Sequence, residues 1–124
     1  MEKKVKSVED LEVFKKSHSL VLRIYELTKQ FPADERYGLI QQIRRSAYSI
    51  PANLMEGSNR LGSREYRQFV GIARGSAAEL KYHLLLTKDL GYISSEIYCE
   101  IEKEILEISR MLMGLANTLE RKQK

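Results

Sequence analysis

The chain has 124 residues, of which 43% are hydrophobic and 31% charged, with a formal net charge of +4. It is long enough for one globular domain that buries about two-thirds of its unfolded surface, and its composition excludes a disordered or fibrous protein. No apolar run approaches the roughly 18 residues that a transmembrane helix needs. The first residues lead into no apolar signal region, and a single cysteine excludes an internal disulfide, so we expect a cytoplasmic protein.

The first predicted helix covers about residues 8–31. Ser7 followed three residues later by Asp10 is typical of a helix start. Phe31-Pro32 ends the helix, because helical geometry is disfavoured for the residue before a proline. The expected buried face is a stripe at three- and four-residue spacing: Leu11, Phe14, His18, Val21, Tyr25 and Thr28. Residues 33–37 then form a connection with room for one short turn.

The second predicted helix covers about residues 38–59 and contains Pro51. A proline inside a helix costs about 3 kcal/mol and removes one backbone hydrogen bond. The alternative is therefore a break, with Ser49 capping a new helix. The apolar stripe, however, passes through the proline without a change of phase: Leu39, Ile43, Ala47, Ile50, Leu54 and Gly57. We therefore predict a helix that is kinked at Pro51 but continuous.

The third and fourth predicted helices cover about residues 63–90 and 95–121. Gly91 ends the third, and Ser94 or Ser95 begins the fourth. The fourth has the cleanest amphipathic pattern of the chain: Ile97, Ile101, Ile105, Ile108, Leu112, Leu115 and Leu119. No segment alternates with the period of two that a strand requires. The prediction is an all-α fold, an up-down-up-down four-helix bundle that forms one domain over residues 1–124.

The third helix has a second stripe, on the side opposite its core stripe, made mostly of small residues. A glycine inside a helix costs about 1 kcal/mol relative to alanine, and this helix holds two of them four residues apart. Close approach of another backbone would compensate, either from tight packing inside one bundle or from another subunit. We favour a homo-oligomer with an interface at Gly71, Gly75, Ala78 and Tyr82.

Residues 41–74 hold the whole net charge of the chain, with six arginines against two glutamates. Four arginines are candidates for an exposed surface that binds RNA or DNA phosphate without sequence preference: Arg44, Arg60, Arg64 and Arg67. An ordinary solvated face is the alternative. The other two are expected in a buried polar network that fixes the register of the helices, made of Arg45, Glu56, Arg74, Ser76 and Glu79.

The acidic last helix offers a second kind of surface. Residues 95–120 carry six glutamates against two basic residues. This charge either complements the basic middle of the chain or forms a second partner surface, with Glu100, Glu104 and Glu107 on or near the exposed side. The alternative function is therefore a protein-interaction scaffold or accessory subunit without direct nucleic-acid contact.

The residues give no positive sign of an enzyme. A metal site in a helical bundle needs Glu-x-x-His on two helices, whereas Glu79 and His83 stand four residues apart without a second copy. His18 and His83 fall on apolar stripes, and Cys99 lies beside one, so we expect core roles for all three. The prediction contains no catalytic residue, no metal and no cofactor.

The chain resembles the bacterial four-helix-bundle family of 23S rRNA-intervening sequence proteins, which includes the accessory variability protein of diversity-generating retroelements. The resemblance runs from about residue 8 to residue 119, and Phe14 stands where the family usually has tryptophan. The matching segments, in order, are residues 10–13, Phe31-Pro32, residues 37–39, residues 42–47, Ser49-Ile50-Pro51 with Asn53, Glu56-Gly57, Phe69, residues 73–76, Glu79, residues 84–86 and residues 88–92.

The resemblance implies a protomer that assembles into a ring-like homopentamer. Family members are encoded within insertions in 23S rRNA genes, and relatives associate with a reverse transcriptase and with nucleic acid through basic surfaces. No enzymatic activity is established for the family. We therefore expect a non-catalytic, cytoplasmic homo-oligomer that associates with nucleic acid or ribonucleoprotein through its arginines, or with a protein such as a reverse transcriptase.

Overall fold

The computed structural model describes residues 7–123, and in that range it holds four α-helices and no strand. The all-α prediction is therefore confirmed. The elements, in chain order, are a 3-10 turn η1 (Val8–Asp10), α1 (Glu12–Thr28), a second 3-10 turn η2 (Ala33–Glu35), α2 (Leu39–Ser58), α3 (Ser63–Asp89) and α4 (Ser95–Lys122).

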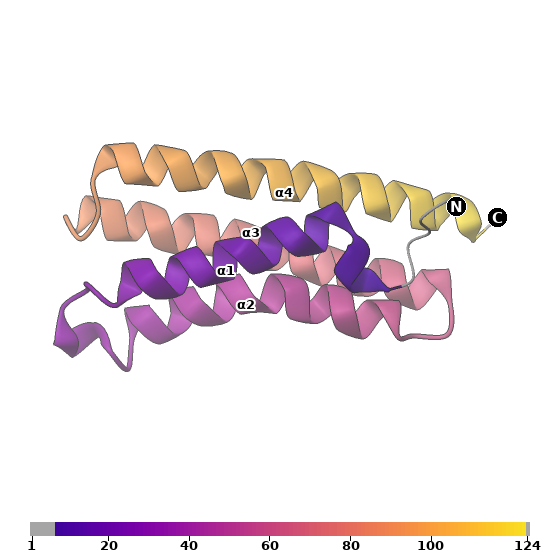
Figure 1. The fold of residues 1–124 in the computed structure, drawn as a ribbon, viewed down its shortest axis with the longest axis horizontal. Coiled ribbons are helices and arrows are strands. Elements are labelled where there is room, and N and C mark those ends of the chain that lie inside the picture. Colours follow the sequence, from indigo (N-terminus) through magenta and orange to yellow (C-terminus); the bar gives the residue numbers. More distant parts are fainter. Residues whose placement is uncertain (1–6, 124) are drawn as a thin grey trace.

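Each helix runs antiparallel to the one before it (Figure 1). Neighbours in the chain pack against each other, and α1 also contacts α4, so the four helices surround one core. The outward face shared by α1 and α2 therefore lies on the side opposite the face shared by α3 and α4. None of the described helices is long and apolar enough to cross a membrane.

The core follows heptad-like spacing on the long helices. The fully or nearly fully buried residues of α3 are Val70, Ala73, Ala77, Leu80, Leu84 and Thr87, and those of α4 are Tyr98, Ile101, Ile105, Ile108, Leu112, Ala116 and Leu119. Alternating three- and four-residue spacing keeps one side of a helix facing its neighbours, as in other four-helix bundles. Every buried side-chain nitrogen and oxygen atom in residues 7–123 has a hydrogen-bond partner.

The first helix differs from its prediction in both start and phase. Leu11 adopts an extended conformation (φ −73°, ψ 136°), which separates the η1 turn from α1. The helix that begins at Glu12 buries Val13, Leu20, Ile24 and other residues of a neighbouring stripe, and it leaves His18 exposed. Of the expected stripe, Val21 and Thr28 are buried and Leu11 and Phe14 pack against the core, whereas His18 and Tyr25 are exposed, so the buried face is shifted from the expected one.

The second helix is continuous through Pro51, as predicted, so the alternative of a break with Ser49 as a new cap is excluded. Its buried face includes Ile43, Ile50 and Leu54, as the stripe predicted, together with the proline itself. The bend at Pro51 stays a prediction. Between α3 and α4, Gly91 has a positive φ of 83°, and the Ser94 hydroxyl caps α4 by accepting a hydrogen bond from the Ile97 N–H at 3.1 Å.

Candidate functional site

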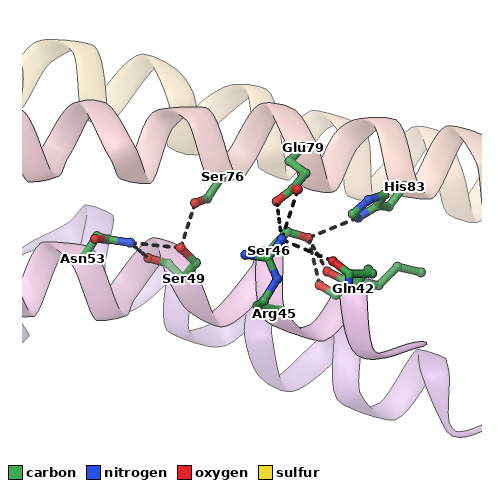
Figure 2. A network of polar contacts seen from close by, with 9 residues as sticks. Gln42, Arg45, Ser46, Ser49, Asn53, Ser76, Glu79 and His83 are labelled. Atoms are coloured by element: carbon green, nitrogen blue, oxygen red, sulfur yellow. Dashed lines mark hydrogen bonds and ion pairs between the residues drawn. The ribbon is translucent and has the colours of Figure 1, made fainter. Parts of the chain in front are cut away.

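Polar side chains of α2 and α3 meet along one side of the bundle (Figure 2). Ser49 Oγ lies 2.8 Å from Ser76 Oγ, and Asn53 Nδ2 donates to the Ser49 hydroxyl at 2.9 Å. One turn away from the Ser49–Ser76 contact, Arg45 forms an ion pair with Glu79 at 3.2 Å. These contacts join the two helices at fixed positions along their length, so they favour one register of α2 against α3.

His83 extends this network at its far end. Its Nδ1 lies 3.5 Å from the hydroxyl of Ser46, which is fully buried and donates to backbone carbonyls of its own helix at 3.0 Å. Burial lowers the pKa of His83 below its ordinary value; the carboxylate of Glu79 opposes this effect and Arg45 adds to it. Because Ser46 donates its hydroxyl proton to backbone carbonyls of its own helix, Ser46 and His83 are arranged for packing rather than for nucleophilic chemistry.

The structure brings together three of the five residues expected in the polar network, namely Arg45, Ser76 and Glu79. The network is half-buried rather than buried. Glu56 instead pairs with Arg60 at 2.8 Å, and Arg74 is exposed in a groove between α3 and α4. The members that sequence reasoning missed are Gln42, Ser46, Ser49, Asn53 and His83. Ser49 and Asn53 carried a usable signal, because polar residues four apart beside a core stripe share one helix face.

Three of the four candidate nucleic-acid arginines lie around the turn between α2 and α3. Arg60 pairs with Glu56, and its guanidinium lies 4.8 Å from the centre of the Phe69 ring. On the α4 side, Arg67 donates to the Ala116 carbonyl at 3.2 Å and lies 3.7 Å from Glu120. Arg64 is exposed and makes no ion pair within residues 7–123. The three therefore surround the start of α3, with Arg64 the most available to a partner.

The fourth candidate, Arg44, lies apart from the others on the face shared by α1 and α2. Its Nε donates to the buried hydroxyl of Thr28 at 2.8 Å, and its guanidinium lies 4.5 Å from the centre of the Tyr25 ring. These contacts fix the guanidinium in place. No carboxylate of residues 7–123 forms an ion pair with it.

The expected interface residues of α3 line an open groove against α4, with a volume of about 520 Å³. Gly71 and Gly75 are exposed there, and a Cβ at either position would meet nothing within 4 Å. Tight packing inside one bundle therefore does not explain these two glycines. Ala78 lines the same groove, and Tyr82, one turn later on this face, is 60% exposed.

The glutamates of α4 contact α1 rather than forming a free acidic surface. Glu107 pairs with Lys16 at 2.8 Å. Arg23 lies 2.6 Å from Glu104 and 3.8 Å from Glu100. The partners of these glutamates are therefore basic residues of α1, not the basic middle of the chain that the sequence suggested. Contact of these glutamates with a basic protein stays a prediction.

The remaining reactive side chains do not gather into a site. Cys99 and His18 are exposed, so the core roles expected for them were wrong. Within residues 7–123 no three side chains of histidine, cysteine, aspartate or glutamate are placed to hold a metal ion.

Comparison with known proteins gives a family and a fold. The model of the family described as 23S rRNA-intervening sequence protein matches residues 9–114. Among solved structures, a protein of unknown function from the S23 ribosomal protein family of Bacteroides thetaiotaomicron is 30% identical, with a TM-score of 0.78. That similarity covers 84% of this chain and 97% of the other. No curated protein matches the chain.

Proposed function

Because the chain belongs to the family of 23S rRNA-intervening sequence proteins, we propose that it is a non-catalytic helical protein that assembles with copies of itself and associates with nucleic acid. In this proposal the assembly is a ring, most simply the pentamer that the family resemblance implies. The ring is cytoplasmic, needs no cofactor and has a bend at Pro51 in each second helix. Its arginines contact RNA, DNA or a ribonucleoprotein.

One observation carries the assembly part of the proposal: Gly71 and Gly75 face an unfilled groove. A helix interior gains about 1 kcal/mol when alanine replaces glycine, so two open glycines on one stripe are costly to the isolated chain. A helix of another subunit that enters the groove would offset this cost by close backbone contact. Arg74 in the same groove makes no ion pair within the described residues and offers that subunit a charged hydrogen-bond donor.

Assembly is tested by the mass of the protein in solution. Light scattering of the wild-type chain is expected to give a multiple of 14.4 kDa, and Gly75→Leu, which fills the groove, is expected to lower that mass. Gly114→Leu is the matched control, because Gly114 is an equally open glycine that does not line the groove. A wild-type mass of one chain would overturn the assembly part of the proposal.

Nucleic-acid association is supported by the arginines around the turn between α2 and α3. Arg64 makes no ion pair with any residue from 7 to 123, and the side chains of Arg60 and Arg67 remain 42% and 41% exposed although both form ion pairs. Repetition of this cluster in every subunit of a ring would multiply its positive field. Phosphate contacts release counterions, so the affinity for RNA or DNA should fall steeply as the salt concentration rises.

Arg64→Ala is the cleanest test of the nucleic-acid contact, because this side chain holds nothing else in place. It should weaken binding, and it should reduce the slope of log affinity against log salt concentration by roughly one. Arg110→Ala removes the same charge from the exposed side of α4 and should change neither quantity. If nuclease treatment leaves captured partners bound and no labelled RNA or DNA binds, the protein is instead a scaffold or accessory subunit for other proteins, such as a reverse transcriptase.

A further inference from the structure

The face shared by α1 and α2 combines an immobilised cation with exposed aromatic rings. Arg44 is half-buried, and the Thr28 hydroxyl and the Tyr25 ring hold its guanidinium, yet no carboxylate of residues 7–123 neutralises it. A guanidinium that is fixed before a partner arrives loses less entropy on binding than a mobile one. The charge of Arg44 is thus positioned for an anion that this chain does not itself supply.

Tyr48 lies one helical turn after Arg44 on the same side of α2. Its side chain is 46% exposed, and no hydrogen bond or ring contact within the described residues engages it. Tyr25 is 36% exposed while its ring lies against Arg44. One turn of helix spans about 5.4 Å, so the face presents two separate flat surfaces, the Tyr48 ring and the Tyr25–Arg44 stack.

We propose that Tyr25, Arg44 and Tyr48 form a stacking platform for single-stranded nucleic acid. Unpaired bases stack on aromatic rings and on arginine planes, whatever their sequence, and the phosphates between them supply the anion that Arg44 lacks. A duplex keeps its bases stacked on each other, so its bases do not reach such a platform. This inference rests on the proposed nucleic-acid association and adds to it a second contact region, remote from Arg64, and a preference for single strands.

The charge on this face favours nucleic acid over a protein partner. A purely apolar protein surface that covered the platform would bury the guanidinium of Arg44 without a counter-ion, which is costly. A strand of RNA or DNA brings both a flat base and a phosphate.

The test uses the full chain and a short fluorescein-labelled oligo-dT, with fluorescence anisotropy as the readout. Alanine in place of a stacking aromatic residue weakens single-strand binding by about 5- to 150-fold, so Tyr48→Ala should fall in that range while Tyr48→Phe keeps the wild-type affinity. Leu106→Ala is the control, because Leu106 is an exposed apolar side chain of α4 that belongs neither to the platform nor to the groove. Since the chain contains no tryptophan, binding should also quench its tyrosine fluorescence, and less so in Tyr48→Ala.

The outcomes separate this inference from the proposed function. If Arg64→Ala weakens binding but Tyr48→Ala does not, nucleic-acid association stands and the platform is rejected. If the wild-type chain binds no RNA or DNA at low salt, both are rejected. Equal affinity for oligo-dT and for a duplex of the same length also overturns the platform. So does a change in the mass of the assembly on Tyr48→Ala, since the face would then be a subunit contact.

Discussion

His83, at the interface of α2 and α3, makes the stability of the bundle depend on pH. Burial lowers its pKa below the ordinary value of 6.5. The folded chain therefore holds this proton less tightly than the unfolded chain does, so protonation favours unfolding. The contribution of His83 to stability is complete above pH 6.5 and declines as the pH falls through that value toward the lower pKa of the folded state.

We predict that His83→Gln makes the stability of the protein less sensitive to pH between neutrality and mild acid. Urea denaturation at a series of pH values measures this change. His18→Gln is the control variant, because His18 is exposed on α1 and lies outside the interface of α2 and α3. Equal pH dependence in wild type and His83→Gln would show that His83 does not titrate differently in the folded state.

At Gly57 the helices α2 and α3 approach each other closely. A Cβ at this position would lie 2.7 Å from Phe69 Cβ and 3.3 Å from the Tyr66 carbonyl oxygen. Backbone-linked atoms would therefore have to move, at a cost of roughly 1–3 kcal/mol, which outweighs the gain of about 1 kcal/mol in helix propensity. Gly57→Ala should lower the free energy of unfolding, whereas Gly114→Ala, with open space around it, should raise it by about 1 kcal/mol. Chemical denaturation of both variants checks the two signs together.

At the scale of the helices, the buried residues could be predicted from the sequence where a helix has a single apolar stripe. Ile43, Ile50 and Leu54 of α2 were expected in the core and are fully buried, because no competing stripe exists on that helix. On α1 two overlapping stripes exist, and Val21 and Thr28 belong to the buried face while His18 does not. Which stripe faces the core depends on how α1 is rotated against its neighbours, and the periodicity of one helix does not determine that rotation.

The polar network was predicted only in part for a similar reason. Arg45 and Glu79 were both expected in the network, and they form an ion pair with each other between α2 and α3. The pairing of Glu56 depends instead on a local alternative, Arg60, four residues away on the same helix. Local pairs of this kind form regardless of how two helices are aligned, whereas pairs between helices require the register that only the packed structure supplies.

The contact between α1 and α4 includes ion pairs and therefore depends on charge. Hydrogen bonding and attraction to Glu107 raise the pKa of Lys16, and the same contact lowers the pKa of the Glu107 carboxyl below its ordinary value of 4.5. The support from Glu107 is thus complete above pH 4.5 and is lost as the pH falls through its lower folded pKa. The support from Lys16 is complete below 10.5 and is lost as the pH rises through its higher folded pKa.

We predict that Lys16→Met returns the pKa of Glu107 toward its ordinary value, as followed by NMR titration of the carboxyl group. Lys15→Met is the matched control, because Lys15 pairs with Glu12 of its own helix at 3.8 Å and does not pair with α4. Salt at about 1 M should produce much of the same change in the wild-type chain, since exposed charges are then screened within about 3 Å. An unchanged Glu107 titration in Lys16→Met would show that the ion pair does not persist in solution.

At the scale of the whole molecule, the four sides of the bundle divide into two kinds. The side between α2 and α3 is joined by the polar network, and the side between α1 and α4 is joined by ion pairs. The other two sides also carry contacts, such as Arg67 with Glu120 and Arg44 with Thr28, but each keeps an open surface: the groove of small residues between α3 and α4, and the aromatic face of α1 and α2 with Arg44. These two open sides point in opposite directions, so one can contact another subunit while the other stays available to nucleic acid.

This division leads to a prediction for stability as a function of protein concentration. If subunits fill the groove, the folded chain is stabilised by mass action, and each tenfold rise in concentration should add up to about 1.4 kcal/mol to the unfolding free energy per chain. Gly75→Leu should remove this dependence while raising the stability of the dilute chain, because leucine favours helix more than glycine does. Gly114→Leu should raise the stability of the dilute chain by a similar amount and keep the dependence. Thermal unfolding at several concentrations measures all three proteins, and a wild-type midpoint that is independent of concentration would mean that the open groove is not a subunit interface.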